Sequence, residues 1–220
     1  MLSGVVFDMD GVLIDSHAAH KTAWRTLLGE LGREVSEGDL AFVLDGRRRD
    51  DILRHFLGEI SEREILEYGK RKDEQFFRLV GLVTVKEGLF QFLDELERHE
   101  IAKAVATSAT SFRADEMLKR FKLTSRFAAT VTGSDVARGK PDPAIFRLAG
   151  IRLKLDPATL MVVEDAASGV KAAKAAGMKC LGIAIGDRVE MLLNAGADAV
   201  VPDFSGMTVA RLHELMTFDS

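Results

Sequence analysis

Two aspartates stand two residues apart at the end of an apolar run near the start of the chain. Asp8 and Asp10 follow the apolar residues 5–7, and Gly11 comes directly after them. Side chains two apart on an extended chain lie on the same side, and glycine allows a sharp turn beyond them. Two close carboxylates raise one another's pKa, so one can stay ionised as a nucleophile while the other carries a proton. The alternative for this motif alone is a strand that merely ends on two acids.

Two further polar groups follow apolar runs later in the chain. Thr107 and Ser108 follow the run 102–106, and a hydroxyl beside exposed backbone N–H groups can hold a phosphate or an oxyanion. Lys140 precedes Pro141, whose ring keeps the chain out of a helix, and a lysine fixed in this way can neutralise a phosphoryl group. The alternatives are helix capping for the hydroxyls and a solvated turn for the lysine.

A second acidic pair, Glu164 and Asp165, ends the apolar run 160–163. Two acids at the end of a buried strand are unfavourable unless a cation pairs with them. Magnesium suits this pair together with Asp8, because it binds carboxylate, phosphate and water oxygens. The sequence holds no cluster of histidines and cysteines that would predict zinc instead.

These motifs require a set of strands that brings their ends together. Continuous apolar runs separated by helical patterns predict a parallel sheet covered on both faces, an α/β doubly wound fold. The predicted helices include one capped by Asp142, with Pro143 in its first turn, and one capped by Ser168. The predicted strands are 5–8, 102–107, 128–132, 160–164, 179–183 and 199–201, and the helices between them are about 87–98, 111–120, 143–150, 168–176 and 188–194.

Residues 16 to about 80 show only helical periodicity. Trp24, Leu27 and Leu31 share one helical stripe that Gly32 ends, and similar stripes follow. We therefore expect a catalytic core of residues 1–15 and 82–220, interrupted by an all-helical cap domain of residues 16–81. Ligands of parallel sheets bind beyond the carboxyl ends of the strands, where this insert leaves the sheet, so it should cover the site as a lid.

Composition limits the location and the partners. The chain has 220 residues and a net charge of −4, which gives no global attraction to nucleic acid or anionic lipid. Its one cysteine, Cys180, cannot form an internal disulfide, which is typical of a reducing cytosol. No basic segment precedes the first apolar run, and no stretch approaches the roughly 20 apolar residues of a membrane span. We expect a monomeric cytoplasmic protein with no nucleic-acid or membrane partner.

In their order along the chain, the four motifs resemble those of the haloacid dehalogenase superfamily, whose members are mostly phosphotransferases with a helical cap. The resemblance implies that Asp8 attacks phosphorus and becomes an aspartyl phosphate, while Asp10 acts as general acid and then as general base. It implies that Thr107 and Lys140 hold the phosphoryl oxygens, with help from the backbone N–H of Ser108. Members that break carbon–halogen bonds lack the second acid, so Asp10 favours phosphoryl transfer.

The same resemblance implies a Mg²⁺ cofactor and its ligands. The ion would be held by the carboxylate of Asp8, the backbone carbonyl of Asp10 and the carboxylate of Asp165. Glu164 would bind it directly or through water. The expected partner is a small phosphorylated metabolite, because a lid of this size should close over small molecules only.

The helical insert is similar to the cap of the β-phosphoglucomutase branch of the superfamily. His20 and Trp24 match its His-x-x-x-Trp, Gly46 and Arg49 its Gly-x-x-Arg, and Lys72 the lysine of its Lys-Arg-Lys run. The resemblance implies that these residues bind substrate, since such cap cations grip the far phosphate of a bisphosphorylated sugar. The chain departs from the branch in two additional arginines before Arg49 and in a short stretch between Arg49 and Lys72.

Three functions agree with these residues. In a phosphatase for small phosphorylated metabolites such as sugar phosphates, which we place first, water resolves the phosphorylated Asp8. In a sugar-phosphate mutase, a second hydroxyl of the sugar receives the phosphoryl group. In a binding protein, the fold persists without catalysis.

Overall fold

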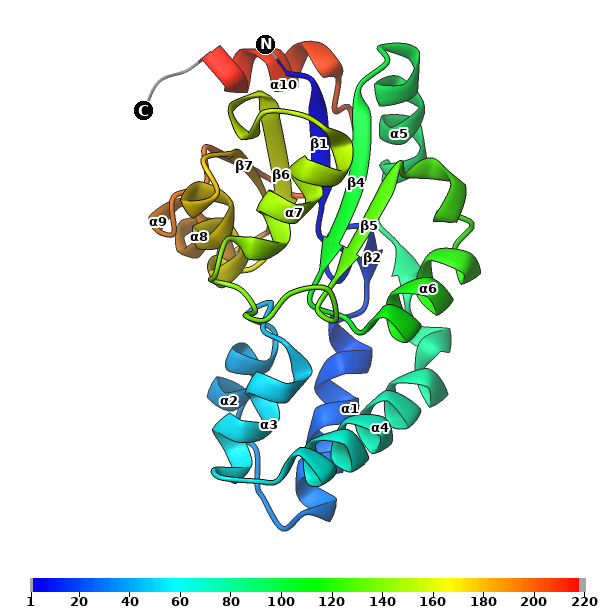
Figure 1. The fold of residues 1–220 in the computed structure, drawn as a ribbon. Helices are drawn as coiled ribbons and strands as arrows, with labels where there is room; N and C mark the ends of the chain where they lie inside the picture. The colour runs from blue at the N-terminus through cyan, green and yellow to red at the C-terminus, as the bar shows by residue number, and fades with distance from the viewer. Residues whose placement is uncertain (1, 218–220) are drawn as a thin grey trace.

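A six-stranded parallel sheet forms the centre of the protein in a computed structural model, which describes residues 2–217 (Figure 1). The strand order is β5-β4-β1-β6-β7-β8, so the first strand lies in the middle. All six predicted strands form, and the predicted doubly wound α/β fold is confirmed. Their bounds are β1 Gly4–Phe7, β4 Ala102–Thr107, β5 Ala129–Thr132, β6 Leu160–Glu164, β7 Lys179–Ile183 and β8 Ala199–Val201.

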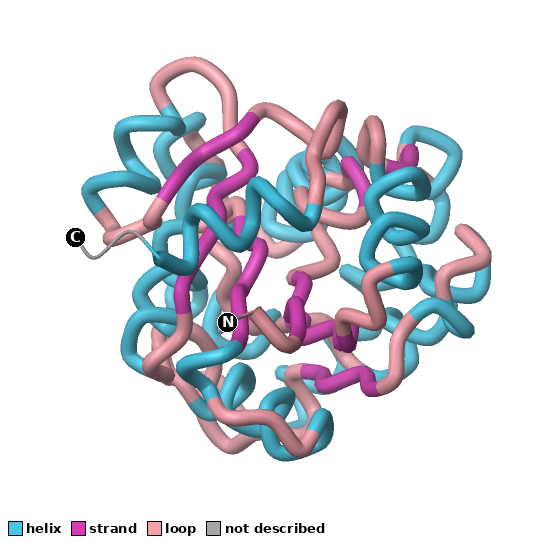
Figure 2. Tube along the Cα trace, turned by 90° about the horizontal axis from the view of Figure 1, so that it is seen from above, coloured by secondary structure: helices cyan, strands magenta, loops and turns pink. Residues whose placement is uncertain are grey.

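Helices cover both faces of the sheet, as Figure 2 shows from above. Alternate residues of each strand point to opposite faces. Phe7 and Val163 pack on one face with α5 (Leu89–Arg98), α6 (Ser111–Arg120) and α10 (Val209–Thr217). Val6, Val162 and Cys180 pack on the other face with α7 (Ala144–Leu153), α8 (Ala167–Ala175) and α9 (Arg188–Asn194). Strands buried on both sides explain the continuous apolar runs in the sequence.

Two predicted helix starts differ in detail from the structure. Asp142 does accept the N–H of Ala144, at 2.9 Å, but Pro143 is the N-cap of α7 and lies outside its first turn. The prediction that Ser168 caps α8 is wrong. The N-cap is Ala166, and the Ser168 hydroxyl donates a hydrogen bond to the carbonyl of Asp45 in another part of the chain.

Four helices form a separate block beyond the carboxyl ends of the strands (Figure 1). Serine capping boxes begin two of them, with Ser36 before α2 and Ser61 before α4. The block has its own apolar cluster, which includes Trp24, Leu53 and Ile65. The helices are α1 His17–Glu30, α2 Glu37–Val43, α3 Arg49–Leu57 and α4 Glu62–Arg78.

The two segments that connect the helical block to the sheet lie side by side. β2 (Ile14–Asp15) and β3 (Thr84–Val85) form a two-stranded antiparallel pair. The sequence did not predict these strands, because two residues are too short to show an alternating pattern. Along residues 2–217, no helix combines the length and the apolar character needed to cross a bilayer.

Candidate active site

A buried lysine joins the acids of two neighbouring strands. β1 and β6 pair with Phe7 opposite Val163, so Asp8 and Glu164 emerge side by side at the carboxyl edge of the sheet. Lys140 Nζ donates to Asp8 Oδ1 at 2.5 Å and to Glu164 Oε1 at 2.6 Å, and it lies 3.3 Å from the carbonyl oxygen of Ala106. The Lys140 side chain has no exposed surface, so this contact is shielded from water.

In the cluster of Asp8, Glu164 and Lys140, one positive charge faces two buried carboxyl groups. Burial raises the pKa of Asp8 well above its ordinary value, since the effect of Lys140 is opposed by Glu164, Asp10 and Asp165. Burial alone would lower the pKa of Lys140, but Asp8 and Glu164 raise it above its ordinary value. One ammonium group thus sits between two buried carboxylates, and a further cation would stabilise both.

Asp10 is held by donors from three parts of the chain. Ser16 Oγ donates to Asp10 Oδ1 at 2.8 Å, His20 Nε2 lies 3.1 Å from the same oxygen, and Arg113 Nη1 lies 2.8 Å from Oδ2. Burial raises the pKa of Asp10, but Arg113 and His20 outweigh it and hold the pKa well below its usual range. The sequence predicts an ionised Asp8 beside a protonated Asp10, whereas in this arrangement the pKa of Asp8 is raised and that of Asp10 is lowered. The sequence did not predict Arg113, which reaches the site from the first turn of α6.

His20 joins Asp10 to the last helix of the block. Lys72 Nζ lies 3.0 Å from His20 Nδ1, and the imidazole stacks on Phe76 with 4.5 Å between the ring centroids. Burial and the charge of Lys72 lower the pKa of His20 to about 3, and burial and Arg113 lower that of Lys72 to about 7. The imidazole is therefore neutral at pH 7. Its Nδ1 faces Lys72, and its Nε2 faces both Asp10 and Arg113 Nη1, which lies 3.2 Å away.

Asp165 lies against the turn that follows the first strand. Its Oδ2 accepts from His17 Nε2 and Arg188 Nη2, both at 2.9 Å. These two groups outweigh burial and lower the pKa of Asp165. Gly11 has a φ of 81°, and a Cβ there would lie only 2.2 Å from Asp165 Oδ2. The glycine is therefore needed both for the turn and for the close approach of the two acidic motifs.

We expect Gly11→Ala to reduce turnover of a phosphate ester by about ten-fold or more, because the alanine methyl group displaces Asp165. Gly32→Ala is the matched control, since Gly32 has a φ of 75° and no heavy atom lies within 4 Å of the place that a Cβ would take. Both variants should lose about 1 kcal/mol of unfolding free energy from the backbone conformation alone. Steady-state assays and urea denaturation would separate the effects, and equal activity of the two variants would contradict the close approach.

The oxygen donors at this edge suit magnesium. The shortage of positive charge beside Asp8 and the approach of the Gly11 turn to Asp165 both favour a hard cation between the two acidic motifs. Within the described range 2–217, no three side chains of His, Cys, Asp or Glu gather into a complete metal site. Magnesium does not need one, because it commonly binds through one or two carboxylates together with phosphate and water oxygens.

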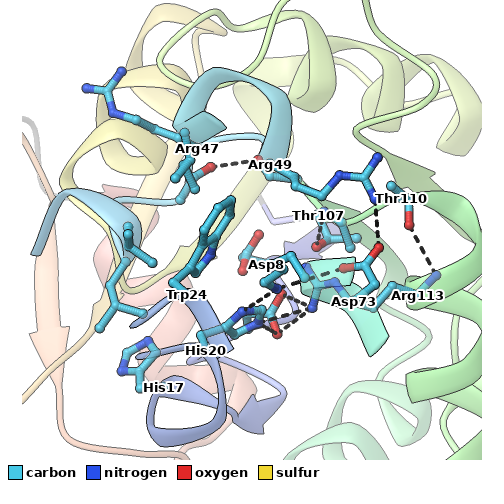
Figure 3. Close-up of a pocket in the computed structure, with 18 of the residues that line it drawn as sticks. Asp8, His17, His20, Trp24, Arg47, Arg49, Asp73, Thr107, Thr110 and Arg113 are labelled. Carbon is cyan, nitrogen blue, oxygen red and sulfur yellow. Dashed lines mark hydrogen bonds and ion pairs between the residues drawn. The ribbon is translucent and has the colours of Figure 1, made fainter. Parts of the chain in front are cut away.

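A pocket that includes Asp8 lies between the helical block and the sheet. Ser108 Oγ donates to the Gly46 carbonyl at 2.6 Å, and the N–H of Ser168 donates to Asp45 Oδ1 at 3.0 Å. Lys140 and Glu164 lie behind Asp8 and do not line this pocket. The other residues predicted for the site do line it: Asp8, Asp10, His20, Trp24, Gly46, Arg49, Lys72, Thr107, Ser108 and Asp165 (Figure 3).

Two predicted residues in the pocket are engaged by neighbours. Thr107 Oγ1 accepts the N–H of Ala109 at 3.1 Å, which fixes the hydroxyl at the end of β4. Arg49 Nη1 donates to Asp73 Oδ2 at 2.8 Å (Figure 3). The structure thus brings the four strand-end motifs and the basic residues of the helical block to one place.

Comparison with known proteins identifies the class. A profile of the family described as "Haloacid dehalogenase-like hydrolase" matches residues 5–183. The chain belongs to this family, which confirms the resemblance drawn from the motifs and the assignment as an enzyme of the hydrolase or mutase type.

Individual relatives resemble the chain over nearly its full length. It is 30% identical to β-phosphoglucomutase of Bacillus subtilis, over 97% of this chain and 95% of that protein. It is 34% identical to a phosphorylated carbohydrates phosphatase of Thermotoga maritima, over 91% of this chain and 94% of that protein. The fold matches the crystal structure of β-phosphoglucomutase from Clostridium difficile with a TM-score of 0.87, at 22% identity, over 98% of this chain and 97% of that one.

Proposed function

We propose that this enzyme is a magnesium-dependent phosphatase for small phosphorylated metabolites, most of all sugar phosphates, and that Asp8 is its nucleophile. The observation that carries this proposal is the placement of Asp8, which is bound to a buried lysine at the carboxyl edge of the sheet and faces the pocket. Asp10 stands two residues further on, lines the same pocket, and is the candidate for proton transfer.

The reaction has two displacements at phosphorus. In the first, an Asp8 carboxylate oxygen attacks phosphorus and the ester P–O bond breaks. The leaving oxygen takes a proton from Asp10, which must first be protonated, because the ion pair with Arg113 keeps Asp10 ionised in the arrangement observed. In the second, a water oxygen attacks the aspartyl phosphate and gives a proton to Asp10, while the bond between phosphorus and Asp8 breaks. Inorganic phosphate and the free Asp8 carboxylate result, and Asp10 has regained its proton.

The other groups at the strand ends would neutralise the charge of the phosphoryl group and hold it in place. We assign the phosphoryl oxygens to Thr107 and the backbone N–H of Ser108, which line the pocket. Lys140, which touches Asp8, would reach a phosphoryl oxygen by turning its ammonium group away from Glu164.

Asp8, the carbonyl of Asp10 and Asp165 would hold Mg²⁺, which supplies positive charge to the phosphoryl oxygens when it is bound. Glu164 would act through water, because its oxygens accept from Lys140 and from the N–H groups of Asp165 and Ala166.

We assign substrate binding to the helical block, taken as a cap domain of residues 16–81 over a core of residues 1–15 and 82–220. Its contribution to the pocket consists of His20, Trp24, Gly46, Arg49 and Lys72. The contacts from Ser108 to Gly46 and from Ser168 to Asp45 close the block over Asp8, which favours a small substrate. The T. maritima relative is named for phosphorylated carbohydrates, which supports a sugar phosphate. We also propose a monomeric cytoplasmic enzyme. The single cysteine supports a reducing compartment, and the net charge of −4 argues against a nucleic-acid or membrane partner.

A β-phosphoglucomutase-type activity is the second candidate, favoured by the 30% identity to the B. subtilis mutase. The first displacement is the same, but a sugar hydroxyl replaces water in the second. Closure of the helical block over Asp8 would exclude water during that step.

One screen tests the proposal. Phosphorylated metabolites, including glucose 1-phosphate with and without a bisphosphate activator, are assayed for both phosphate release and isomerisation, in magnesium and in chelator. Magnesium-dependent phosphate release without isomer supports the phosphatase. Accumulation of glucose 6-phosphate supports the mutase, and no turnover of any compound supports a binding protein that keeps the fold.

We expect Asp10→Asn to lower turnover by roughly 10²- to 10⁴-fold, the usual contribution of general acid–base catalysis. The loss should be smaller for an aryl phosphate, because its leaving oxygen needs less help from an acid. A direct comparison of kcat for an aryl and an alkyl phosphate checks this. Equal losses for both substrates would argue against Asp10 as the acid.

A further inference from the structure

The closed pocket around Asp8 is small, and a larger groove lies beside it. The pocket has a volume of about 70 Å³, whereas ligand pockets commonly measure roughly 300–1,000 Å³. The neighbouring groove measures about 820 Å³. Arg49, Asp73 and Thr110 line both spaces, so the groove adjoins the pocket. In the arrangement observed, a substrate larger than its phosphate must extend beyond the pocket.

Apolar side chains from both halves of the molecule line the groove, together with the charged residues Lys70, Glu74 and Arg78. Leu66, Lys70 and Phe77 follow one stripe of α4, at i, i+4 and i+11, and line the groove. Phe112 of α6 faces them, and its ring lies 5.8 Å from that of Phe77. Leu66 is 68% exposed and Phe112 is 64% exposed. Large apolar side chains gathered on one exposed groove are typical of a surface that binds a ligand or a protein.

The boundary between the two spaces is polar. The ion pair of Arg49 and Asp73 stands at this boundary with the Thr110 side chain (Figure 3). A ligand that spans the boundary would therefore place an anionic end toward Asp8, polar groups beside Arg49, and apolar atoms against Phe77 and Phe112. This shared boundary points to the substrate itself as the occupant.

We propose that the groove binds an apolar extension of the leaving group, so that among phosphorylated metabolites the enzyme prefers those whose sugar or other leaving group carries an aryl or alkyl portion. The proposal rests on the phosphatase function and specifies its substrate class. The chemical steps at Asp8 stay the same, because the groove contacts only the part of the substrate that departs.

The test compares 1-naphthyl phosphate with glycerol phosphate as substrates. We expect Leu66→Ala and Phe112→Ala to lower kcat/KM for the naphthyl ester by about ten-fold, mainly through KM, with little change for glycerol phosphate. Ile151→Ala, at an isoleucine that is 70% exposed on α7, is the matched control and should change neither. No change with the naphthyl ester, or equal losses with both substrates, would overturn the proposal.

A binding measurement separates this proposal from the phosphatase function. The affinities of 1-naphthyl phosphate and methyl phosphate for the Asp8→Asn variant are measured by calorimetry. Tighter binding of the naphthyl ester that is lost in Asp8→Asn/Phe112→Ala supports the groove even if no ester is hydrolysed. Equal affinities overturn it, as does a dimer in sedimentation that Leu66→Ala dissociates, since a second copy would then occupy the groove.

Discussion

Asp8→Asn is expected to abolish phosphate release, with a loss of at least about 10⁴-fold, because the amide cannot form the covalent intermediate. The amide keeps the shape of the side chain and an oxygen that can accept from Lys140, which now lies 2.5 Å from Asp8. The thermal midpoint should therefore remain within a few degrees of that of the wild type. Phosphate release assays and calorimetry on the same preparations give both quantities.

The outcome separates a chemical role from a structural one. Loss of activity together with a lowered thermal midpoint would mean that Asp8 serves the fold. Residual activity within about ten-fold of the wild type would mean that another group is the nucleophile.

Lys140→Met should produce the largest loss of stability, about 3–5 kcal/mol, because it leaves two buried carboxylates without their cation. In the wild type, Lys140 opposes the effect of burial on the pKa of both Asp8 and Glu164. Without the lysine, both pKa values rise further above those of the unfolded chain. Stability that depends on protonated carboxyl groups is present at low pH and is lost as the pH rises. The variant should thus be close to the wild type near pH 4 and much weaker at pH 8, as measured by urea denaturation in chelator.

The double variant Lys140→Met/Glu164→Gln provides the control. Removing the charge of Glu164 leaves a single buried acid, so part of the loss at pH 8 should return. A loss that is the same at every pH, or unchanged in the double variant, would mean that packing around Phe146, whose ring lies 4.9 Å from Lys140 Nζ, dominates.

The placement of the strand-end residues was predictable because it is local. Asp8 and Glu164 directly follow or end continuous apolar runs, and parallel strands bring their carboxyl ends to one edge of the sheet. The order of the motifs along the chain then determined the family. The basic residues of the helical block were predicted by resemblance, since nothing in their own spacing distinguishes a binding cation from a solvated one.

The residues that the sequence did not reveal act across the molecule. Arg113 reaches Asp10 from α6, and Arg188 reaches Asp165 from the start of α9. Both are ordinary arginines near the start of a helix in the sequence, and only the docking of distant elements brings them to an acid. For Ser168, in contrast, the sequence predicted a role that the structure does not show. Its position suggested a helix cap, but its hydroxyl bonds to the helical block instead.

Trapping the phosphorylated enzyme tests the central claim most directly. The wild type is mixed with a substrate found in the screen, quenched in acid within milliseconds, digested, and analysed by mass spectrometry. The account predicts the mass of one phosphoryl group on the peptide that contains Asp8, and none in Asp8→Asn. A phosphoryl group on any other residue, or turnover with no phosphorylated peptide at any time, would contradict it.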